Sequence, residues 1–309
     1  MPEGDSVWRA AAQLHSALAG QQLLSSDFRV PRFATLRLEG WVVREVVARG
    51  KHLLMRLQGP GSSSERLTIH SHLKMEGAWQ VYPLGGRWRK PGFTARCVLR
   101  TAAADAVGFS LGILEVVATA DEDSVVGHLG PDLLGPDWDA GEAQRRLLRA
   151  PDAPVGVALL DQRNLAGIGN IYRCETCFLS GIHPASPISA VADLPALLGD
   201  AKRLLEANLG SARRSTLTGS PGWADRRSPG SAGHGSSMTA ELTGARSISR
   251  SREARPGWRS GYWVYGREHQ PCLRCGTPIR RGVLAKGTGA EERTIYFCPS
   301  CQPEPGIEL

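Results

Sequence analysis

The sequence predicts an α+β protein of several domains, in which an N-terminal antiparallel β-sandwich is followed by an all-helical domain and a small cysteine-bearing β-hairpin unit. Short strand-like runs separated by turn residues dominate as far as residue 117. Past Gly130 the apolar spacing becomes helical, and two Cys-x-x-Cys pairs stand near the C-terminus. We expect three domains, at residues 1–129, 130–210 and 261–309, with an insertion at residues 211–260 between the last two.

The chain begins Met1-Pro2-Glu3-Gly4-Asp5, and removal of the initiator methionine would expose the secondary amine of Pro2. An α-amino group titrates at about 7.7 to 8.0, so an appreciable fraction is unprotonated near neutral pH and can act as a nucleophile. The carboxyl group of Glu3 could transfer the proton that attack on a carbonyl or acetal carbon requires. The alternative is a solvated, disordered terminus. A helix expected over residues 6–19 would fix Pro2 in space.

The rest of the first domain consists of short strand-like runs. Turn residues such as Gly59-Pro60-Gly61 separate these runs, which favours an antiparallel sandwich or barrel. Cys97 falls in one of them and is expected to be a small buried hydrophobic residue. The strands are expected at residues 35–38, 41–47, 52–57, 67–69, 95–99 and 113–117.

The second domain contains a glycine-rich helix start, Gly167-Ile168-Gly169-Asn170. Unobstructed N–H groups of Gly167 and Gly169, together with the positive end of the helix dipole, would favour an anion such as a phosphate there. Alternatively, the glycines only permit a tight turn between helices. Cys174 and Cys177 share a helical face with apolar residues, and we expect them to be buried rather than metal-binding. Helices are expected at residues 140–148, 157–160, 170–179 and 192–209.

Residues 211–260 differ in composition from the rest of the chain. They contain nine arginines, no lysine and three acidic residues, and so carry most of the net charge of +7. Glycine, serine and proline account for 21 of these 50 residues, which predicts a disordered linker because so little apolar surface can be buried. The linker either adds a salt-dependent attraction to phosphates or is a tolerated insertion.

Two Cys-x-x-Cys pairs, Cys272 with Cys275 and Cys298 with Cys301, stand 22 residues apart. Four thiolates satisfy a tetrahedral zinc ion and leave no open position, so we expect one structural Zn²⁺ per chain. A unit of about fifty residues has little core, and metal binding would supply much of its folding free energy. The segment between the pairs predicts a β-hairpin that carries Arg280, Arg281, Lys286 and Arg293.

Length and composition set the broad class. The chain has 309 residues, of which 41% are hydrophobic, as expected for a soluble protein with a substantial core. No secretory signal and no membrane-spanning run is apparent, so we expect a cytoplasmic, nucleoid-associated monomer with reduced thiols. The positive net charge predicts a polyanionic partner.

Four separated segments resemble the formamidopyrimidine-DNA glycosylase and endonuclease VIII family of base-excision repair enzymes. Their order along the chain matches the family, and apart from residues 211–260 the resemblance extends from end to end. The resemblance implies the family fold, in which the helical domain contains a helix-two-turns-helix motif and the C-terminal unit is a zinc finger. The segments are Met1 to Gly4, Arg49 to Leu54, Gln162 to Tyr172 and Arg293 to Gln302.

The resemblance implies a role for each candidate residue. Pro2 would attack C1′ of a damaged nucleotide and form a Schiff base, with Glu3 as acid and base. Lys51, Asn170 and Arg293 would hold the phosphates beside the lesion. Elimination at both phosphates would then cut the strand. The implied function is a DNA glycosylase that is also an abasic-site lyase.

The opening Pro-Glu-Gly-Asp is more similar to the endonuclease VIII branch, which favours oxidised pyrimidines. Met75, in His72-Leu73-Lys74-Met75-Glu76-Gly77, is either a wedge that fills the space left by a flipped base or a core methionine. Residues 106–112 are Ala-Val-Gly-Phe-Ser-Leu-Gly, which departs from the stretch of the formamidopyrimidine branch that directs an arginine and a phenylalanine to the orphaned base. This departure makes single-stranded or bubble DNA a candidate substrate beside damaged duplex.

Two other functions are compatible with the sequence. One is a glycosylase specific for 8-oxoguanine and formamidopyrimidines, against which the missing arginine and phenylalanine count. The other is a non-catalytic zinc-ribbon DNA-binding protein with an inert N-terminus. Trapping with borohydride separates it from the enzymes, because only a Schiff base becomes covalently linked to DNA.

Overall fold

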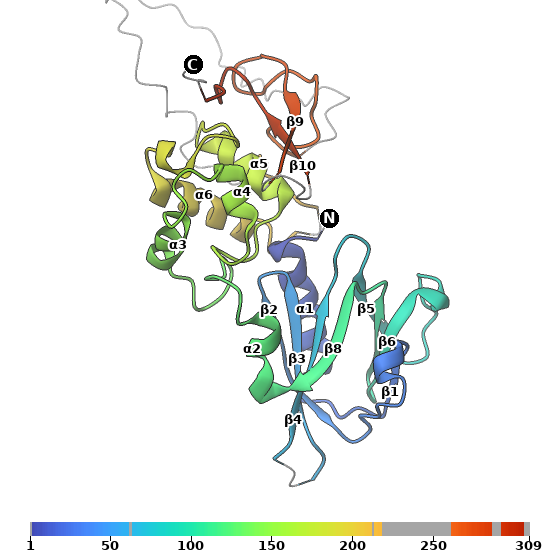
Figure 1. Ribbon diagram of the computed structural model, residues 1–309. Coiled ribbons are helices and arrows are strands. Elements are labelled where there is room, and N and C mark those ends of the chain that lie inside the picture. Colours follow the sequence, from blue (N-terminus) through green and yellow to red (C-terminus); the bar gives the residue numbers. More distant parts are fainter. Residues whose placement is uncertain (1, 62–63, 212, 218–260, 286–291, 306–309) are drawn as a thin grey trace, which may run out of the picture.

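The computed structural model describes residues 2–61, 64–211, 213–217, 261–285 and 292–305. It has a lower β-rich half and an upper half made of helices and a hairpin (Figure 1). Three features of the sequence prediction fall outside the described residues: Met1, Lys286 and the linker from residue 218 to residue 260. None of the helices in the described part has the length and apolar character needed to span a bilayer.

The N-terminal half is the antiparallel sandwich that the sequence predicted. Two four-stranded sheets, ordered β2-β3-β4-β8 and β1-β6-β7-β5, pair antiparallel throughout. Helix α1 (Gly4–Leu18) packs Val7, Leu14 and Leu18 into their shared core. The strands are β1 (Ser25–Phe28), β2 (Val42–Arg49), β3 (His52–Gln58), β4 (Arg66–His72), β5 (Ala78–Pro83), β6 (Ala95–Arg100), β7 (Ala104–Phe109) and β8 (Ile113–Ala118).

The strand prediction was wrong in two respects. Residues 35–38 form no strand, because the N–H of Leu38 donates to the Ser26 hydroxyl at 2.8 Å instead of to a neighbouring strand. Strands β1, β5 and β7 were not predicted. All six residues of β7 are buried, so the strand lacks the alternation of apolar and polar residues that marks a half-exposed strand. Cys97 is fully buried in β6, as expected.

The helical part confirms the four predicted helices, with ends shifted by up to three residues. Asp139 and Asp193 cap two of them, each accepting a backbone N–H at 2.9 Å. Cys177 is fully buried in the core of this part, as expected. The helices of this part are α3 (Ala140–Leu147), α4 (Val155–Leu160), α5 (Asn170–Leu179) and α6 (Leu194–Glu206), whereas the short α2 (Asp123–Val126) lies beside the sandwich (Figure 1).

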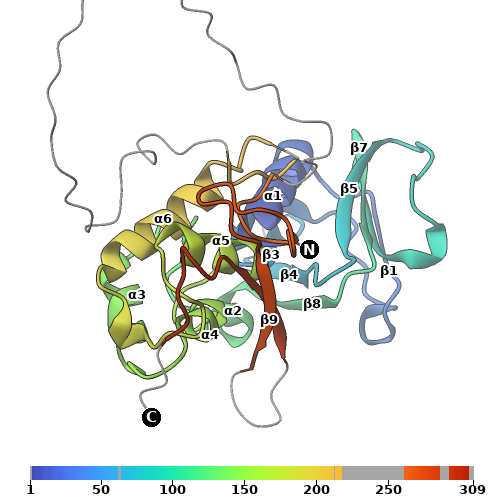
Figure 2. The same cartoon turned by 90° about the horizontal axis from the view of Figure 1, so that it is seen from above.

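The C-terminal part packs directly on α5. Strands β9 (Arg280–Leu284) and β10 (Arg293–Phe297) form an antiparallel hairpin, and the view from above places it beside α5 (Figure 2). Cys174 and Phe178 of α5 share a small core with residues of this part, among them Val264. The hairpin is therefore fixed to the helix whose start forms the site described below.

Residues 213–217 belong to the folded part, which corrects the predicted start of the linker at residue 211. Thr216 is buried, and its N–H donates to the Gly261 carbonyl at 2.7 Å. Arg214 forms an ion pair with the fully buried carboxylate of Asp5. The composition of the segment concealed these contacts, because the partners lie far away in the sequence.

Candidate active site

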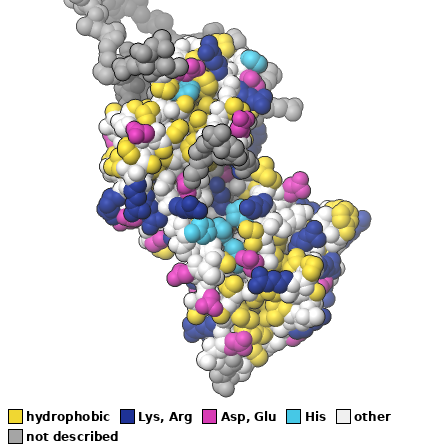
Figure 3. All heavy atoms as spheres, viewed as in Figure 1, with side chains coloured by type: hydrophobic (Ala, Val, Ile, Leu, Met, Phe, Trp, Pro, Cys, Tyr) yellow, Lys and Arg dark blue, Asp and Glu magenta, His cyan; other side chains and the backbone are white. Residues whose placement is uncertain are grey.

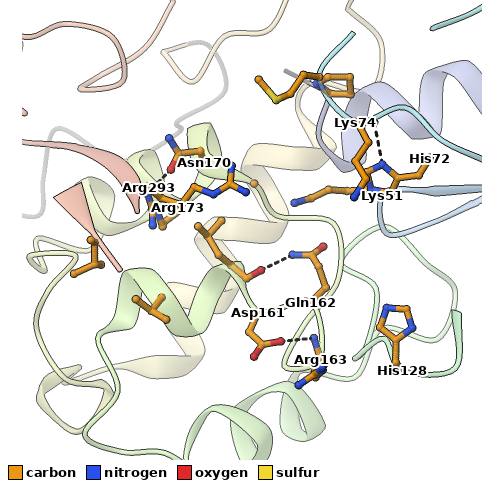
Figure 4. Close-up of a pocket in the computed structure, with 16 residues that line it drawn as sticks. Lys51, His72, Lys74, His128, Asp161, Gln162, Arg163, Asn170, Arg173 and Arg293 are labelled. Carbon is orange, nitrogen blue, oxygen red and sulfur yellow. Dashed lines mark hydrogen bonds between the residues drawn. The ribbon is translucent and has the colours of Figure 1, made fainter. Parts of the chain in front are cut away.

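A cleft of about 690 Å³ lies where the sandwich, the helical part and the hairpin meet. Its labelled lining residues come from the β2–β3 turn, the end of β4 and the loop after it, the segment after α2, the loop between α4 and α5, and the starts of α5 and β10 (Figure 4). Lysine, arginine and histidine side chains cluster on the surface between the lower and upper halves of the molecule (Figure 3). Among the lining residues are Pro2, Lys51, His72, Lys74, Met75, His128, Asn170, Arg173 and Arg293.

The carboxylate of Glu3 is fully buried at the start of α5. It accepts the backbone N–H groups of Gly169 and Ile171 at 2.8 Å each, and that of Tyr172 at 3.4 Å. The N–H of Gly167 donates to Gln162 at 3.0 Å. The N–H groups of Gly169 and Ile171, at the helix start where the sequence suggested that an anion could bind, therefore hold the Glu3 carboxyl group. The helix dipole and three N–H donors stabilise it there.

Glycines allow the N-terminus to approach α5 this closely. A Cβ atom on Gly169 would lie 2.4 Å from the Glu3 carboxyl carbon. Gly4 donates its N–H to the Gly167 carbonyl at 2.8 Å, and a Cβ on Gly4 would lie 3.1 Å from the Cα of Gly167. Gly167 itself has φ = +104°, which other residues rarely adopt. The glycines thus fix the direction of the first residues of the chain.

Lys51 lies in the tight β2–β3 turn beside this carboxylate. Gly50 supplies the positive φ of +59° that the turn requires. Its N–H donates to Asp132 at 2.7 Å, and the other oxygen of Asp132 accepts the Leu134 N–H at 3.1 Å. Arg49 adds an ion pair to Asp137 at 2.7 Å. The turn that carries Lys51 is therefore fastened to the helical part.

Burial perturbs both ionisable groups at the centre of the site. Burial raises the pKa of Glu3, while the positive charges of Arg214 and Lys51 oppose the rise. Burial lowers the pKa of Lys51; the charge of Glu3 opposes this, whereas Arg293 lowers the pKa further. Such shifts are typical of sites that transfer protons.

Asn170 and Arg173 connect the start of α5 with the hairpin. The Asn170 side-chain amide donates to the Thr294 carbonyl at 2.9 Å, and Arg173 donates to the same oxygen at 3.0 Å. Arg173 also donates to the Asn170 side-chain oxygen. Arg293, the first residue of β10, lines the cleft beside them (Figure 4). The structure thus brings Pro2 close to the four polar residues that the sequence predicted for the site, which are Glu3, Lys51, Asn170 and Arg293.

Met75 lies in the loop between β4 and β5, and 63% of its surface is exposed. It lines the cleft, so the alternative of a core methionine is wrong. The loop is held by the N–H of Lys74, which donates to the Nδ1 atom of His72 at 2.9 Å. Lys74 adopts a positive φ of 52°.

Sequence reasoning missed a cluster of four histidines beside the cleft. His52 stacks on His70, with ring centroids 5.0 Å apart, and also contacts His72 and His128. A ring nitrogen of His70 lies 3.0 Å from a carboxylate oxygen of Glu115. Burial lowers the pKa of His52 to about 3 and that of His72 to about 4, so both are neutral at pH 7. Because β3, β4 and the segment after α2 supply these residues, no local pattern could have revealed the cluster.

Arg214 and Asp5 were also missed. The Arg214 guanidinium donates to both Asp5 oxygens and lies 5.1 Å from the centre of the Tyr172 ring. Arg9 donates to the same carboxylate at 3.1 Å. Since Asp5 lies in the first turn of α1, this ion pair helps to fix the segment that carries Pro2 and Glu3.

The turn between β7 and β8 offers no exposed aromatic side chain to a ligand. Phe109 is fully buried and Leu111 is 8% exposed. The structure thus agrees with the sequence, which lacks an arginine and an exposed aromatic residue here.

The four cysteines predicted as metal ligands converge. Their sulfur atoms all lie within 4.8 Å of one another, with Cys272 and Cys301 at 4.0 Å and Cys275 and Cys298 at 3.4 Å. A tetrahedral zinc–thiolate site with bonds of about 2.3 Å has sulfur atoms about 3.8 Å apart. Among the described residues this is the group of Cys, His and acidic side chains that could hold a metal ion, and Cys174 and Cys177 are not part of it.

Comparisons with known proteins agree with this arrangement. The model of the formamidopyrimidine-DNA glycosylase N-terminal domain matches residues 1–110, and that of the formamidopyrimidine-DNA glycosylase H2TH domain matches residues 129–217. A probable endonuclease 8 2 of Streptomyces coelicolor is 45% identical, over 99% of this chain and 97% of its own. The DNA-(apurinic or apyrimidinic site) lyase Nei2 of Mycolicibacterium smegmatis is 40% identical, over 98% and 99%.

Solved structures share the fold. A Lactococcus lactis Fpg in complex with DNA containing an abasic site has a TM-score of 0.70 and 22% identity, and the match covers 98% of this chain and 100% of that one. At 22% identity, this similarity shows only that the two proteins share a fold.

Proposed function

Because the chain belongs to the formamidopyrimidine-DNA glycosylase and endonuclease VIII family, we propose that it removes oxidised bases, chiefly pyrimidines, from DNA and cuts the strand at the resulting abasic site. The observation that carries the proposal is that Pro2 lines a cationic cleft directly next to the buried carboxyl group of Glu3. Glu3 is anchored at the start of α5, and Pro2 lines the cleft with Lys51 and Arg293.

In the proposed reaction, the amine of Pro2 bonds to C1′ as the bond from C1′ to the damaged base breaks. Glu3 carries the amine proton to O4′ of the sugar, so that the ring opens and leaves a cationic Schiff base. A pKa raised by burial suits this role, because Glu3 can then hold a proton nearer to neutral pH. The cation acidifies the C2′ protons, and successive eliminations release the 3′ and 5′ phosphates.

Lys51, Arg293 and Asn170 hold the phosphates that flank the lesion. Lys51 and Arg293 supply charge from opposite sides of the cleft, one from the β2–β3 turn and the other from the hairpin (Figure 4). The side-chain amide of Asn170 donates to the carbonyl of Thr294 and so fixes the position of the hairpin relative to α5. Clamping the sugar between these groups makes attack by Pro2 effectively unimolecular. Met75, exposed at the rim, fills the space that the flipped base leaves.

We further propose that Cys272, Cys275, Cys298 and Cys301 hold one structural zinc ion. Four thiolates leave no position for a substrate, so the ion stabilises the hairpin and takes no part in the reaction. Its contribution to the reaction is indirect, because the same hairpin carries Arg293.

The preference for pyrimidines rests on three observations. The N-terminal Pro-Glu-Gly-Asp is similar to the endonuclease VIII branch, and several relatives bear the name endonuclease 8. The β7–β8 turn also presents no exposed aromatic residue.

Borohydride trapping tests the nucleophile. Processed protein should become covalently linked to an abasic-site oligonucleotide, whereas Pro2→Gly and a protein with a tag retained before Pro2 should not be trapped and should not cut. Circular dichroism of both controls must match that of the unaltered protein. Full trapping of the tagged protein would contradict the proposal, and absence of trapping in the processed protein would favour a non-catalytic DNA-binding protein.

A cleavage panel tests the substrate. Thymine glycol, dihydrouracil and 5-hydroxycytosine should be cut faster than 8-oxoguanine opposite cytosine, in duplex and in single-stranded oligonucleotides. The reverse order would support the purine-specific alternative.

A further inference from the structure

A basic loop, residues 84–94, connects β5 and β6 at the outer edge of the sandwich (Figure 1). From residue 77 to residue 104 the sequence contains five basic residues and no acidic residue. Arg87 and Arg89 are exposed. Within the described part of the chain, neither they nor Lys90 form an ion pair with an acidic side chain. The three basic side chains of the loop therefore present positive charge that no acidic side chain of the described residues neutralises in an ion pair.

Phe93 lies in the same loop and is 84% exposed, which is the largest exposure of any large hydrophobic residue described. Its exposure is not a consequence of a loose loop. Trp88 packs edge-on against Phe109 with ring centroids 5.8 Å apart, and the N–H of Arg89 donates to the Tyr82 hydroxyl at 3.1 Å. Arg29 covers the Trp88 ring at 5.5 Å and donates to the Gly92 carbonyl at 3.1 Å. The backbone that carries Phe93 is thus fixed from three sides.

The basic loop is attached to the rim of the cleft. The ammonium group of Lys90 lies 3.4 Å from the carbonyl oxygen of Glu76, and Glu76 directly follows Met75, which lines the cleft. Basic and hydrophobic side chains also stand together at this edge of the sandwich (Figure 3). A DNA strand that leaves the cleft past Met75 would next contact the surface of the basic loop.

We propose that the basic loop binds an unpaired stretch of DNA next to the cleft, with a base stacked on Phe93 and phosphates at Arg87, Arg89 and Lys90. Exposed aromatic rings among cations are the usual platform for single-stranded nucleic acid, since every base has a face that can stack. The proposal deepens the proposed function and rests on it. The loop would hold the unpaired DNA that lies beyond the lesion and outside the cleft.

Equilibrium binding of the full chain to undamaged fluorescent oligonucleotides tests the loop without any chemistry. Phe93→Ala should weaken binding to a single-stranded 20-mer about five- to tenfold, because the stacking of one base is lost. It should leave binding to a fully paired duplex unchanged. Leu24→Ala is the matched control, because Leu24 is 53% exposed on the same sandwich. Equal loss in both variants, or no loss with Phe93→Ala, would overturn the proposal.

The charges have their own readout. Replacing Arg87, Arg89 and Lys90 together by alanine should reduce the slope of log affinity against log salt by about 2 for a single strand, since each phosphate contact contributes about 0.7. Arg44→Ala, a change at an exposed arginine of β2, serves as the control. An unchanged slope would refute the contact with phosphates. These results do not depend on trapping by Pro2, so failure of the loop and failure of the enzymatic proposal remain distinguishable.

Discussion

Replacing Gly169 by alanine should disable the site without disturbing the backbone. Gly169 has φ = −127°, which alanine adopts without strain. The added Cβ would lie 2.4 Å from the carboxyl carbon of Glu3 and 2.8 Å from one of its oxygens. To regain ordinary contact, the carboxyl group must retreat by about 1 Å in a close-packed environment. It would then lose one or two of the hydrogen bonds from Gly169 and Ile171.

The expected loss of stability in Gly169→Ala follows from the hydrogen bonds that the Glu3 carboxyl group would lose. Each hydrogen bond to a charged group contributes about 1.5 to 3 kcal/mol, so the loss of one or two of them should lower the free energy of unfolding by about 1.5 to 6 kcal/mol. A displacement of about 1 Å at a reacting group costs about 100-fold in rate. Single-turnover cleavage of a duplex with an oxidised pyrimidine, at saturating enzyme, should slow by this factor.

The chain provides a matched control at Gly199, inside α6, where an added Cβ meets no atom within 4 Å. Gly199→Ala should stabilise the protein by about 0.4 to 1 kcal/mol and leave the cleavage rate unaltered. Thermal unfolding and single-turnover kinetics of both variants check the reasoning. A Gly169→Ala protein with the original stability and rate would refute it, since the buried carboxylate would then tolerate displacement.

Three further predictions concern the metal, the linker and the electrostatics of Glu3. Elemental analysis should find about one zinc per chain, lost in Cys298→Ser and kept in Cys174→Ser; the reverse pattern would contradict the assignment. Deletion of residues 218–260 should leave single-turnover cleavage intact but reduce the salt dependence of DNA affinity, and an unchanged slope would identify the segment as a tolerated insertion. Burial raises the pKa of Glu3 and the positive charge of Arg214 opposes the rise, so Arg214→Gln should raise this pKa further. Whichever limb of the pH–rate profile Glu3 controls should move to higher pH, whereas Arg214→Lys, which keeps the charge, should restore it; a profile that does not move would show that Arg214 acts through structure alone.

The sequence predicted those features that depend on local spacing. The cysteine pairs and helix α5 follow from patterns within a few residues, and the sandwich follows from short runs between turns. Strand β7 was missed because its neighbours bury both of its faces. The pattern of one segment cannot report the burial that other segments impose.

The candidate site was predictable residue by residue but not as an arrangement. Nothing near Glu3 indicates that it accepts the N–H of Gly169, which lies 166 positions away. The same holds for the ion pair between Asp5 and Arg214. The glycine-rich helix start did indicate an anion, and the structure shows that the protein supplies that anion itself.

The anchoring of Glu3 on α5 has a consequence for the order of events during synthesis. Pro2 and Glu3 leave the ribosome first, yet the N–H groups that hold Glu3 belong to residues 169–172, and Arg293 follows more than a hundred residues later. Domains fold largely in the order in which they are made, so the nascent sandwich can form while its first residues are still undocked. Removal of Met1 would have this interval in which to act, and Pro2, the proposed nucleophile, would meet Glu3, Lys51 and Arg293 only after the helical part and the hairpin have been made.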